Sequence, residues 1–252
     1  MKNRVVFLGL IILCLSHKSD ADTLLGLYAG AQTWNMQTSG GFSNNDDNAN
    51  FNFDDQANPN LYVAFEHPVP LIPNVKVQRT VMDTNGETTL DTSFDFGGNT
   101  YGSSSNLITD VELTATDFIL YYELFDNDLI SFDLGLNTKY IDGALFVTDK
   151  GDQSNSARER FSGPIPMAYS RLALGLPLTG FGAFVEGSFL SIDDQTLSDY
   201  QAAVTYSLIE NLAIDVTFQI GYRAITLKLD DLDDIYADLE FKGFFAGLEV
   251  HF

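Results

Sequence analysis

The sequence has 252 residues, of which 35 are acidic and 13 basic, so its formal net charge is −22. A chain this acidic repels the phosphate backbone, which argues against nucleic-acid binding. Its single cysteine, Cys14, lies in the N-terminal leader, so neither a disulfide framework nor a thiolate metal site is expected.

The N-terminus has the layout of a secretory signal peptide. Lys2 and Arg4 precede the apolar stretch 5–15, which gives way to polar residues and the small residue Ala21. A membrane anchor is the alternative, but this stretch is too short to cross a bilayer as a helix. We therefore predict a signal peptide over residues 1–21.

The remaining chain, 22–252, alternates between apolar and polar residues. In 130–137, 212–223 and 244–252, apolar side chains occupy nearly every second position, as in strands with one apolar face. No segment approaches 18 consecutive apolar residues, so a membrane could be crossed only by a closed β-barrel. A soluble β-sandwich would show similar alternation.

The expected fold is all-β, an antiparallel transmembrane β-barrel. An even strand number suits a bacterial barrel. Eight strands remain an alternative, because the sixth to eighth are less regular. We place ten strands at 24–34, 60–66, 74–83, 110–124, 129–147, 165–177, 181–191, 197–207, 211–228 and 238–252.

The connections between these strands alternate in length. Long polar loops are predicted at 35–59, 84–109, 148–164 and 229–237, and short turns at 66–74, 125–128, 177–180 and 207–211. The connection near 193–196 is short where a long one is expected. Outer-membrane barrels have long extracellular loops and short periplasmic turns, so we expect both termini in the periplasm of a Gram-negative bacterium.

Several segments resemble a known family. These are Glu66-His67-Pro68-Val69-Pro70-Leu71-Ile72-Pro73-Asn74-Val75, Trp34, Tyr121-Tyr122-Glu123 and the aromatic terminus Phe252. Together they resemble uncharacterised outer-membrane β-barrel proteins of proteobacteria, and the resemblance runs across nearly all of the mature chain. It implies a barrel fold and an outer-membrane location, without an established activity. Phe252 also resembles the C-terminal signal that the barrel-assembly machinery reads.

The histidines argue against catalysis at the extracellular rim. His17 lies in the leader, while His67 and His251 fall at the predicted periplasmic end. Omptin proteases are also ten-stranded barrels, and their chemistry relies on an aspartate pair and an aspartate–histidine pair at the outer rim. A barrel lipase would need serine and histidine there. We therefore expect no enzymatic activity, and nothing suggests a cofactor.

Clusters of aspartates in the predicted loops raise the question of calcium, because hard cations favour several carboxylate oxygens. Neither the first nor the last cluster has the spacing of a calcium loop, so solvated loops are the favoured interpretation. The candidates are Asp46, Asp47, Asp54, Asp55, Asp230, Asp231, Asp233 and Asp234.

Charges of both signs are predicted to line the lumen. A barrel of eight to ten strands is narrow enough for side chains to fill, and unpaired charges there would be costly to bury. We therefore favour a filled or narrow lumen over a general porin, while the excess of acids leaves a cation-selective leak open. The inward set is Glu66, Lys76, Arg79, Glu112, Asp133, Lys139, Arg171, Glu186, Asp199, Gln201, Asp215, Arg223 and Glu249.

Two outward lysines, Lys228 and Lys242, are expected to be neighbours near the upper ends of the last strands. They could pair with lipopolysaccharide phosphates or simply extend to the membrane surface. Outer-membrane lipid, lipopolysaccharide and the assembly machinery are therefore the expected partners. The leading functional hypothesis is a barrel with a structural or surface-contact role, and the alternative is a small cation-selective channel.

Overall fold

The structure, a computed structural model, describes residues 25–252 apart from 46–47, 128, 193–194, 212 and 233–234, and gives the backbone alone at 192, 195 and 230–232. The predicted signal peptide, 1–21, lies outside the described residues. The strands are β1 (Gly26–Ser43), β2 (Ala49–Asn50), β3 (Asn52–Phe53), β4 (Gln56–Glu66), β5 (Asn74–Val81), β6 (Thr84–Thr89), β7 (Phe94–Phe96), β8 (Asn99–Tyr101), β9 (Asn106–Asp126), β10 (Ile130–Asp149), β11 (Ser156–Leu176), β12 (Phe181–Ile192), β13 (Gln195–Ile209), β14 (Asp215–Leu232) and β15 (Ile235–His251).

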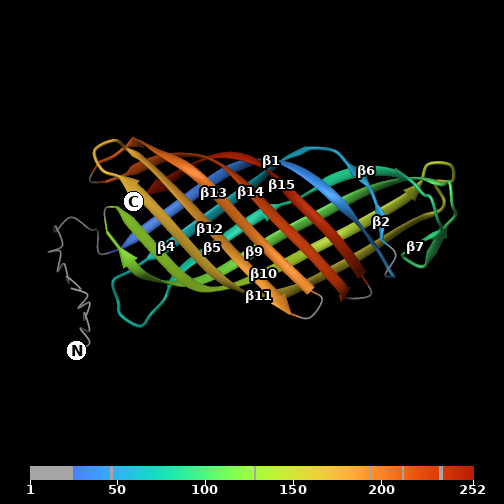
Figure 1. Cartoon of the computed structure of the whole chain (residues 1–252), viewed down its shortest axis with the longest axis horizontal. Helices are drawn as coiled ribbons and strands as arrows, with labels where there is room; N and C mark the ends of the chain where they lie inside the picture. Colours follow the sequence, from blue (N-terminus) through green and yellow to red (C-terminus); the bar gives the residue numbers. More distant parts are fainter. Residues whose placement is uncertain (1–24, 46–47, 128, 193–194, 212, 233–234) are drawn as a thin grey trace, which may run out of the picture.

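These elements form a closed antiparallel barrel (Figure 1). Each long strand pairs with the next, β15 pairs with β1, and β9 pairs with β10 to close the ring. β5 and β6 pair with β9 in one continuous register and act as a single interrupted barrel strand. The barrel built by the described residues therefore has ten strands, as predicted, and not eight.

The half of the barrel that carries the chain ends, here called the terminal half, is apolar outside. On β10 the outward positions from Ile130 to Tyr140, apolar except for Thr138, extend over about 25 Å along the barrel axis, at about 3.3 Å per residue and a tilt of about 40°. That is the height of the lipid-facing band of a membrane barrel. Exposed aromatic rings border the band, as such barrels require: Tyr140, Tyr200 and Tyr222 above, and Tyr122, Phe181 and Tyr206 below.

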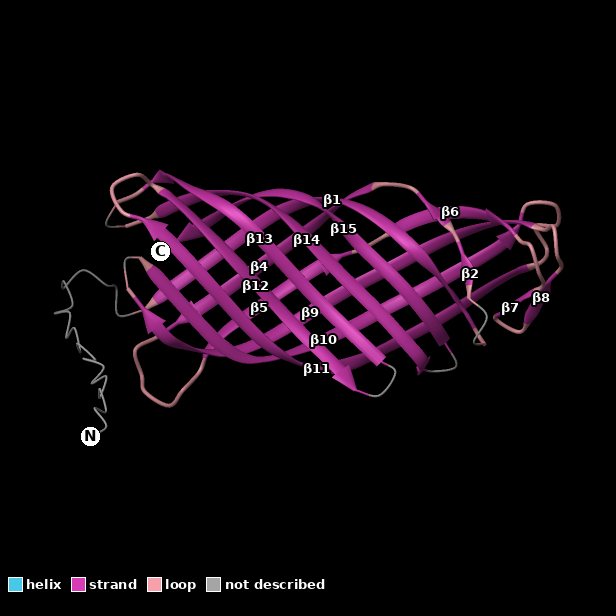
Figure 2. Ribbon diagram, viewed as in Figure 1, coloured by secondary structure: helices cyan, strands magenta, loops and turns pink. Residues whose placement is uncertain are grey.

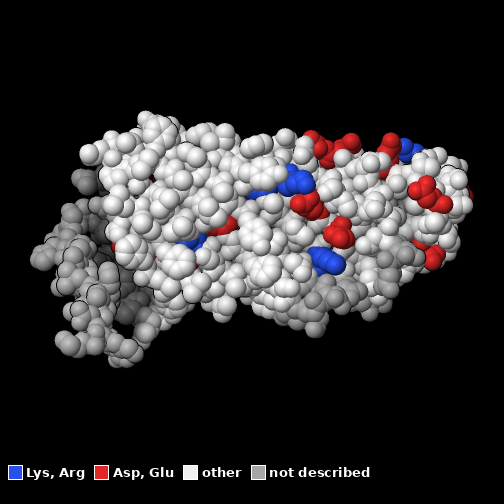
Figure 3. Space-filling view, in the orientation of Figure 1, with Lys and Arg blue, Asp and Glu red and all other residues white. Residues whose placement is uncertain are grey.

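The opposite half, here called the distal half, has the reverse polarity. On β9, Val111 and Leu113 are buried inside the barrel, while Asp110 and Glu112 between them are exposed outside. Nearer the terminal end, Phe118 is on the exposed outer face. β9 thus keeps its alternation and exchanges its apolar face part-way along, and β15 does the same. Figure 3 shows the result on one side of the molecule, where exposed charges gather over the distal half.

An apolar cluster, here called the distal core, fills the inside of the distal half. Its members include Phe42, Phe51, Phe96, Tyr101 and Phe241, all 5% exposed or less. The β7–β8 hairpin lies at this end of the barrel (Figure 2). It contributes Tyr101, whose hydroxyl donates to the carbonyl oxygen of Val147 at 3.3 Å and whose burial raises the pKa of the phenol.

The strands run further into the distal half than the sequence predicted. Polar residues of these segments face water on the outside of the wall. Their sequences therefore resemble those of loops, although their backbones remain paired as strands. The predicted loop 229–237 was wrong, because residues 229–232 belong to β14 and residues 235–237 belong to β15. The predicted loop 148–164 shrinks to 150–155 for the same reason. In the part of the chain that the structure describes, no helix is long and apolar enough to cross a membrane.

Candidate functional site in the lumen

A layer of buried ion pairs crosses the lumen of the terminal half. Asp199 on β13 accepts from Arg223 Nε and Nη2 at 2.9 and 2.7 Å, and from Lys139 Nζ at 3.0 Å. Lys139 Nζ also lies 2.7 Å from Asp117 Oδ1. The side chains of Lys139 and Arg223 are only 1% exposed. Two acids and two bases therefore neutralise one another across the barrel, with Asp199 at the centre.

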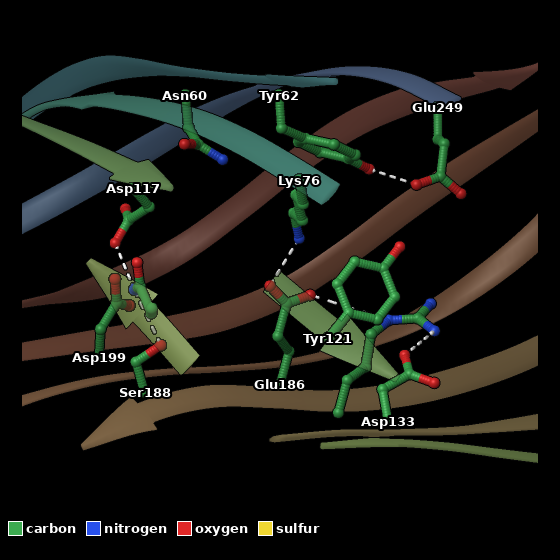
Figure 4. Close-up of polar contacts among 12 residues, drawn as sticks. Asn60, Tyr62, Lys76, Asp117, Tyr121, Asp133, Glu186, Ser188, Asp199 and Glu249 are labelled. Carbon is green, nitrogen blue, oxygen red and sulfur yellow. Dashed lines mark hydrogen bonds and ion pairs between the residues drawn. The ribbon is translucent and has the colours of Figure 1, made fainter. Parts of the chain in front are cut away.

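A second ionic cluster lies beside it (Figure 4). Lys76 Nζ donates to Glu186 Oε1 at 2.6 Å, and Arg171 stands 3.8 Å from both Glu186 and Asp133. The register explains this arrangement, because Arg171 on β11 lies opposite Asp133 on β10 and Glu186 on β12. These four residues again balance in charge, and together with the first four they form what we call the lumen network.

Neutral side chains extend the lumen network between strands that are far apart in the sequence. Gln32 donates to Gln219 at 3.0 Å, Gln219 donates to the Tyr62 hydroxyl at 3.1 Å, and that hydroxyl donates to Glu249 at 2.6 Å. Asn60 donates to Gln32 at 2.7 Å. These bonds connect side chains of β1, β4, β14 and β15 across the lumen.

Below the lumen network, towards the chain ends, is a cavity of about 240 Å³ that we call the vestibule. Its acids include Glu66, Glu123 and Asp126, with Glu66 accepting from the Tyr121 hydroxyl at 2.7 Å. Lys76 and Arg171 are the cations on its wall. The vestibule is therefore a small acidic recess whose upper wall is the lumen network.

Two residues predicted to face the lumen do not. Arg79 and Glu112 are both exposed on the outer wall, and the Glu112 side chain lies 3.3 Å from Arg158. These two charges were assigned to the lumen, whereas a charge can face outward wherever the wall stands above the lipid. Alternation from the outward Phe118 instead identifies Asp117, which the sequence analysis missed, as an inward residue.

The other predicted lumen residues lie on the inner face. Lys76, Asp133, Lys139, Arg171, Glu186, Asp199 and Arg223 form the ionic clusters, Gln201 lies beside them, and Glu66 and Glu249 line the vestibule. Asp215 stands nearer the terminal rim, 3.5 Å from His251 Nδ1. Cross-strand register, which decides these partners, was not readable from the sequence.

The calcium candidates divide into described and undescribed residues. Asp54 accepts from Asn85 at 2.6 Å and Asp55 accepts from Gln37 at 3.1 Å, so both contact neighbouring amides. Within the described chain no group of three or more His, Cys, Asp or Glu side chains is placed to hold a metal. Asp46, Asp47, Asp233 and Asp234 lie outside the described residues, and at Asp230 and Asp231 only the backbone is described.

The outward lysines are not the neighbours that the sequence suggested. Lys228 pairs in register with Asp238 on β15, four residues from Lys242, which is about 13 Å along the strand. Lys242 is held by Glu240 at 2.6 Å. These lysines therefore do not form one joint site.

Comparisons with known proteins concern the fold. No protein-family model matches the sequence, and no curated protein matches it. The chain is similar to the transport unit of the autotransporter AIDA-I from Escherichia coli, with a TM-score of 0.43 and 8% identity over 95% of this chain and 93% of that one. It is also similar to Ail, the attachment invasion locus protein of Yersinia pestis, with a TM-score of 0.36 and 11% identity over 90% and 97% of the two chains. A third similar structure is the toluene transporter TodX of P. putida, with a TM-score of 0.32 and 8% identity over 90% and 89%.

The wall itself indicates the kind of protein. Its terminal half has an apolar exterior of bilayer height, a polar interior and a closed hydrogen-bonded ring of strands. This is the arrangement that lets backbone amides cross hydrocarbon without unpaired groups. The chain is a barrel membrane protein.

Proposed function

We propose that this barrel is an integral outer-membrane protein of a Gram-negative envelope, with a closed lumen and a structural or surface-contact role. The two longest connections between barrel strands, 44–55 and 90–105, are at the distal end, which supports a periplasmic position for both chain ends, because long connections of such barrels face outward. The wall beyond the lipid band, together with the β7–β8 hairpin, would then project from the cell surface.

The observation that carries this proposal is the double closure of the lumen. The lumen network fills the terminal half with paired charges, and the distal core fills the other half with apolar side chains. Ions would have to break several buried ion pairs and then pass through a packed hydrocarbon region. Each barrier alone opposes conduction.

Planar-bilayer conductance tests the closure. Refolded protein, shown to be folded by altered gel migration before boiling, should give no steady channels. A variant with Lys139 and Asp199 changed to Ser should remain silent, since the distal core is intact, and so should one with Phe42 and Phe96 changed to Ser. Combining all four changes should produce current. Steady channels in the unmodified protein would refute the closed lumen.

The acidic vestibule favours a second candidate, a small cation-selective channel. Its carboxylates would concentrate cations at the terminal mouth of any path through the barrel. This alternative expects currents whose reversal potential follows the cation gradient. Glu66→Gln together with Glu249→Gln should then reduce the selectivity, and unchanged selectivity would count against a role for the vestibule.

Catalysis is not part of the proposal. Of the described histidines, His67 lies in the β4–β5 turn and His251 ends β15, both at the terminal end. An omptin-type or lipase mechanism at the distal rim would have to do without them. A protease and esterase screen of the refolded protein should be negative, and turnover that survives purification of the folded form would refute this expectation.

We expect the assembly machinery to recognise the C-terminal strand. The backbone amide of Phe252 donates to the carbonyl oxygen of Leu27 at 3.0 Å, so the terminal residue is joined to the closing strand β1. Phe252→Ala should lower the amount of heat-modifiable barrel in cells. Refolding of the purified variant in detergent should stay normal, and an equal loss in both settings would point to stability instead of recognition.

A further inference from the structure

The outer wall carries a groove at the distal border of the apolar band. Its volume is about 560 Å³, and it runs over β5, β9, β10 and β11. Arg79, Arg158 and Arg160 line it together with Tyr140 of the aromatic border. Register places Arg79 opposite Thr116, which in turn lies opposite Tyr140, so this end of the groove begins where the apolar surface stops.

The concentration of arginines in this groove contrasts with the rest of an acidic chain. Four basic residues are used inside the lumen network, and Lys150 is paired with Glu87 near the distal end. Besides the groove arginines, the described outer wall of the long strands carries only the basic residues Lys228 and Lys242. The wall therefore gathers its arginines on a single face.

The groove arginines are available for a ligand. Arg158 lies over the Phe146 ring at 4.1 Å and pairs with Glu112 at 3.3 Å, yet its side chain is 39% exposed. Among the ion pairs of the described residues, none includes Arg79 or Arg160. Two guanidinium groups thus have no ion-pair partner among the residues that the structure describes, and a third is held flat by an aromatic ring.

Three carboxylates line the groove beside the three arginines, so its formal charge is zero and anion binding depends on how these acids are held. Glu112 is already paired with Arg158, and Asp83 accepts the backbone amide of Leu113 at 3.0 Å. Asp142 is the remaining carboxylate on its wall. A phosphate can approach a carboxylate when Mg²⁺ lies between them, since that ion is commonly held by one or two carboxylates and phosphate oxygens.

We propose that this arginine groove binds the phosphorylated headgroup of a glycolipid in the outer leaflet, an inference that rests on the outer-membrane location proposed above. Arginine forms paired hydrogen bonds with phosphate oxygens. Arg79 on β5 and Arg160 on β11 are three strand spacings apart across the sheet, roughly 14 Å, and four residues apart along it, roughly 13 Å, so about 20 Å separates their backbones. Because both side chains line the same groove, their guanidinium groups can contact different phosphates of one headgroup. The acyl chains of such a lipid would lie on the apolar band below.

Binding to a phosphorylated glycolipid tests the proposal. Refolded protein in detergent with Mg²⁺ is titrated with bis-phosphorylated lipid A, with its dephosphorylated form and with inorganic phosphate, and complexes are counted by native mass spectrometry. The expected order is strong binding of the bis-phosphorylated lipid and little binding of the other two. Equal binding of the dephosphorylated lipid would overturn the proposal, as would full competition by inorganic phosphate at equal concentration.

Matched variants locate the site. Changing Arg79, Arg158 and Arg160 together to Gln should weaken lipid A binding by at least about tenfold, because the charge-assisted hydrogen bonds to phosphate oxygens are lost. The control, Lys228→Gln with Lys242→Gln, removes outward charges outside the groove and should change binding less than about threefold. Equal losses in both variants would overturn the groove assignment. Gel migration and conductance of the same samples report separately on the barrel and its closed lumen.

Discussion

Asp199→Asn should be among the most destabilising polar substitutions in the barrel. The carboxylate holds Lys139 and Arg223, whose side chains are 1% exposed, and the amide keeps its size while removing its charge. Lys139 would then keep Asp117, while Arg223 would lose its ion-pair partner among the described residues. Breaking a buried pair in this way costs about 3–5 kcal/mol.

Urea unfolding in lipid vesicles measures this loss. Trp34 is the single tryptophan of the chain, is 1% exposed, and has its ring centre 5.4 Å from the Arg223 guanidinium carbon. Its fluorescence therefore reports on the lumen network directly. Asp110→Asn, on the exposed outer wall, is the matched control and should change the free energy of unfolding by no more than about 0.5 kcal/mol.

A double-mutant cycle separates charge pairing from packing. Lys139→Met removes the opposite charge, so the double variant with Asp199→Asn should be less destabilised than the sum of the single variants, by about 1–3 kcal/mol. A loss below about 1 kcal/mol for Asp199→Asn alone would show that water reaches the network. That result would refute a dry ionic layer and favour the channel alternative.

Three further substitutions examine other parts of the wall. Leu136→Arg, at an outward position that is 70% exposed in the apolar band, should reduce stability in vesicles by about 2–4 kcal/mol, and a neutral effect would misplace the band. Phe96→Ala, fully buried in the distal core, should cost about 3–5 kcal/mol in urea unfolding, and a loss under about 1 would mean that the hairpin is loosely packed. Gly30→Val should lower the thermal midpoint because its Cβ would lie 2.1 Å from the Tyr62 ring, whereas Gly163→Val, with open space around it, should not.

The sequence was sufficient to predict the strands of the terminal half. There the apolar face is outward and constant, so the alternation on β10 and β14 identified both the strand and its lipid-facing side. The same reasoning failed beyond the lipid band. A strand with an apolar inner face and a charged outer face shows the same alternation in its sequence as a strand with the opposite orientation. Only the neighbouring strands and the position of the lipid band show which face is inward.

The partners within the lumen network were beyond sequence reasoning for a different reason. Arg223 lies opposite Gln201 in register but binds Asp199, two residues along the same strand. Gln32 meets Gln219 although β1 and β14 are not neighbours in the sheet. Such contacts depend on strand tilt and on the closing pair β1–β15, neither of which a local pattern contains.

The exchange of faces also explains why one barrel can be closed by two different chemistries. Within the lipid band the apolar face of each strand contacts lipid. The polar face therefore lines the lumen, where its charges form ion pairs. Beyond the band water takes the polar face, and the apolar side chains pack together inside. A channel would need both conditions relaxed in one conformation. The closed lumen that we propose would therefore depend on how far the strands extend beyond the lipid band.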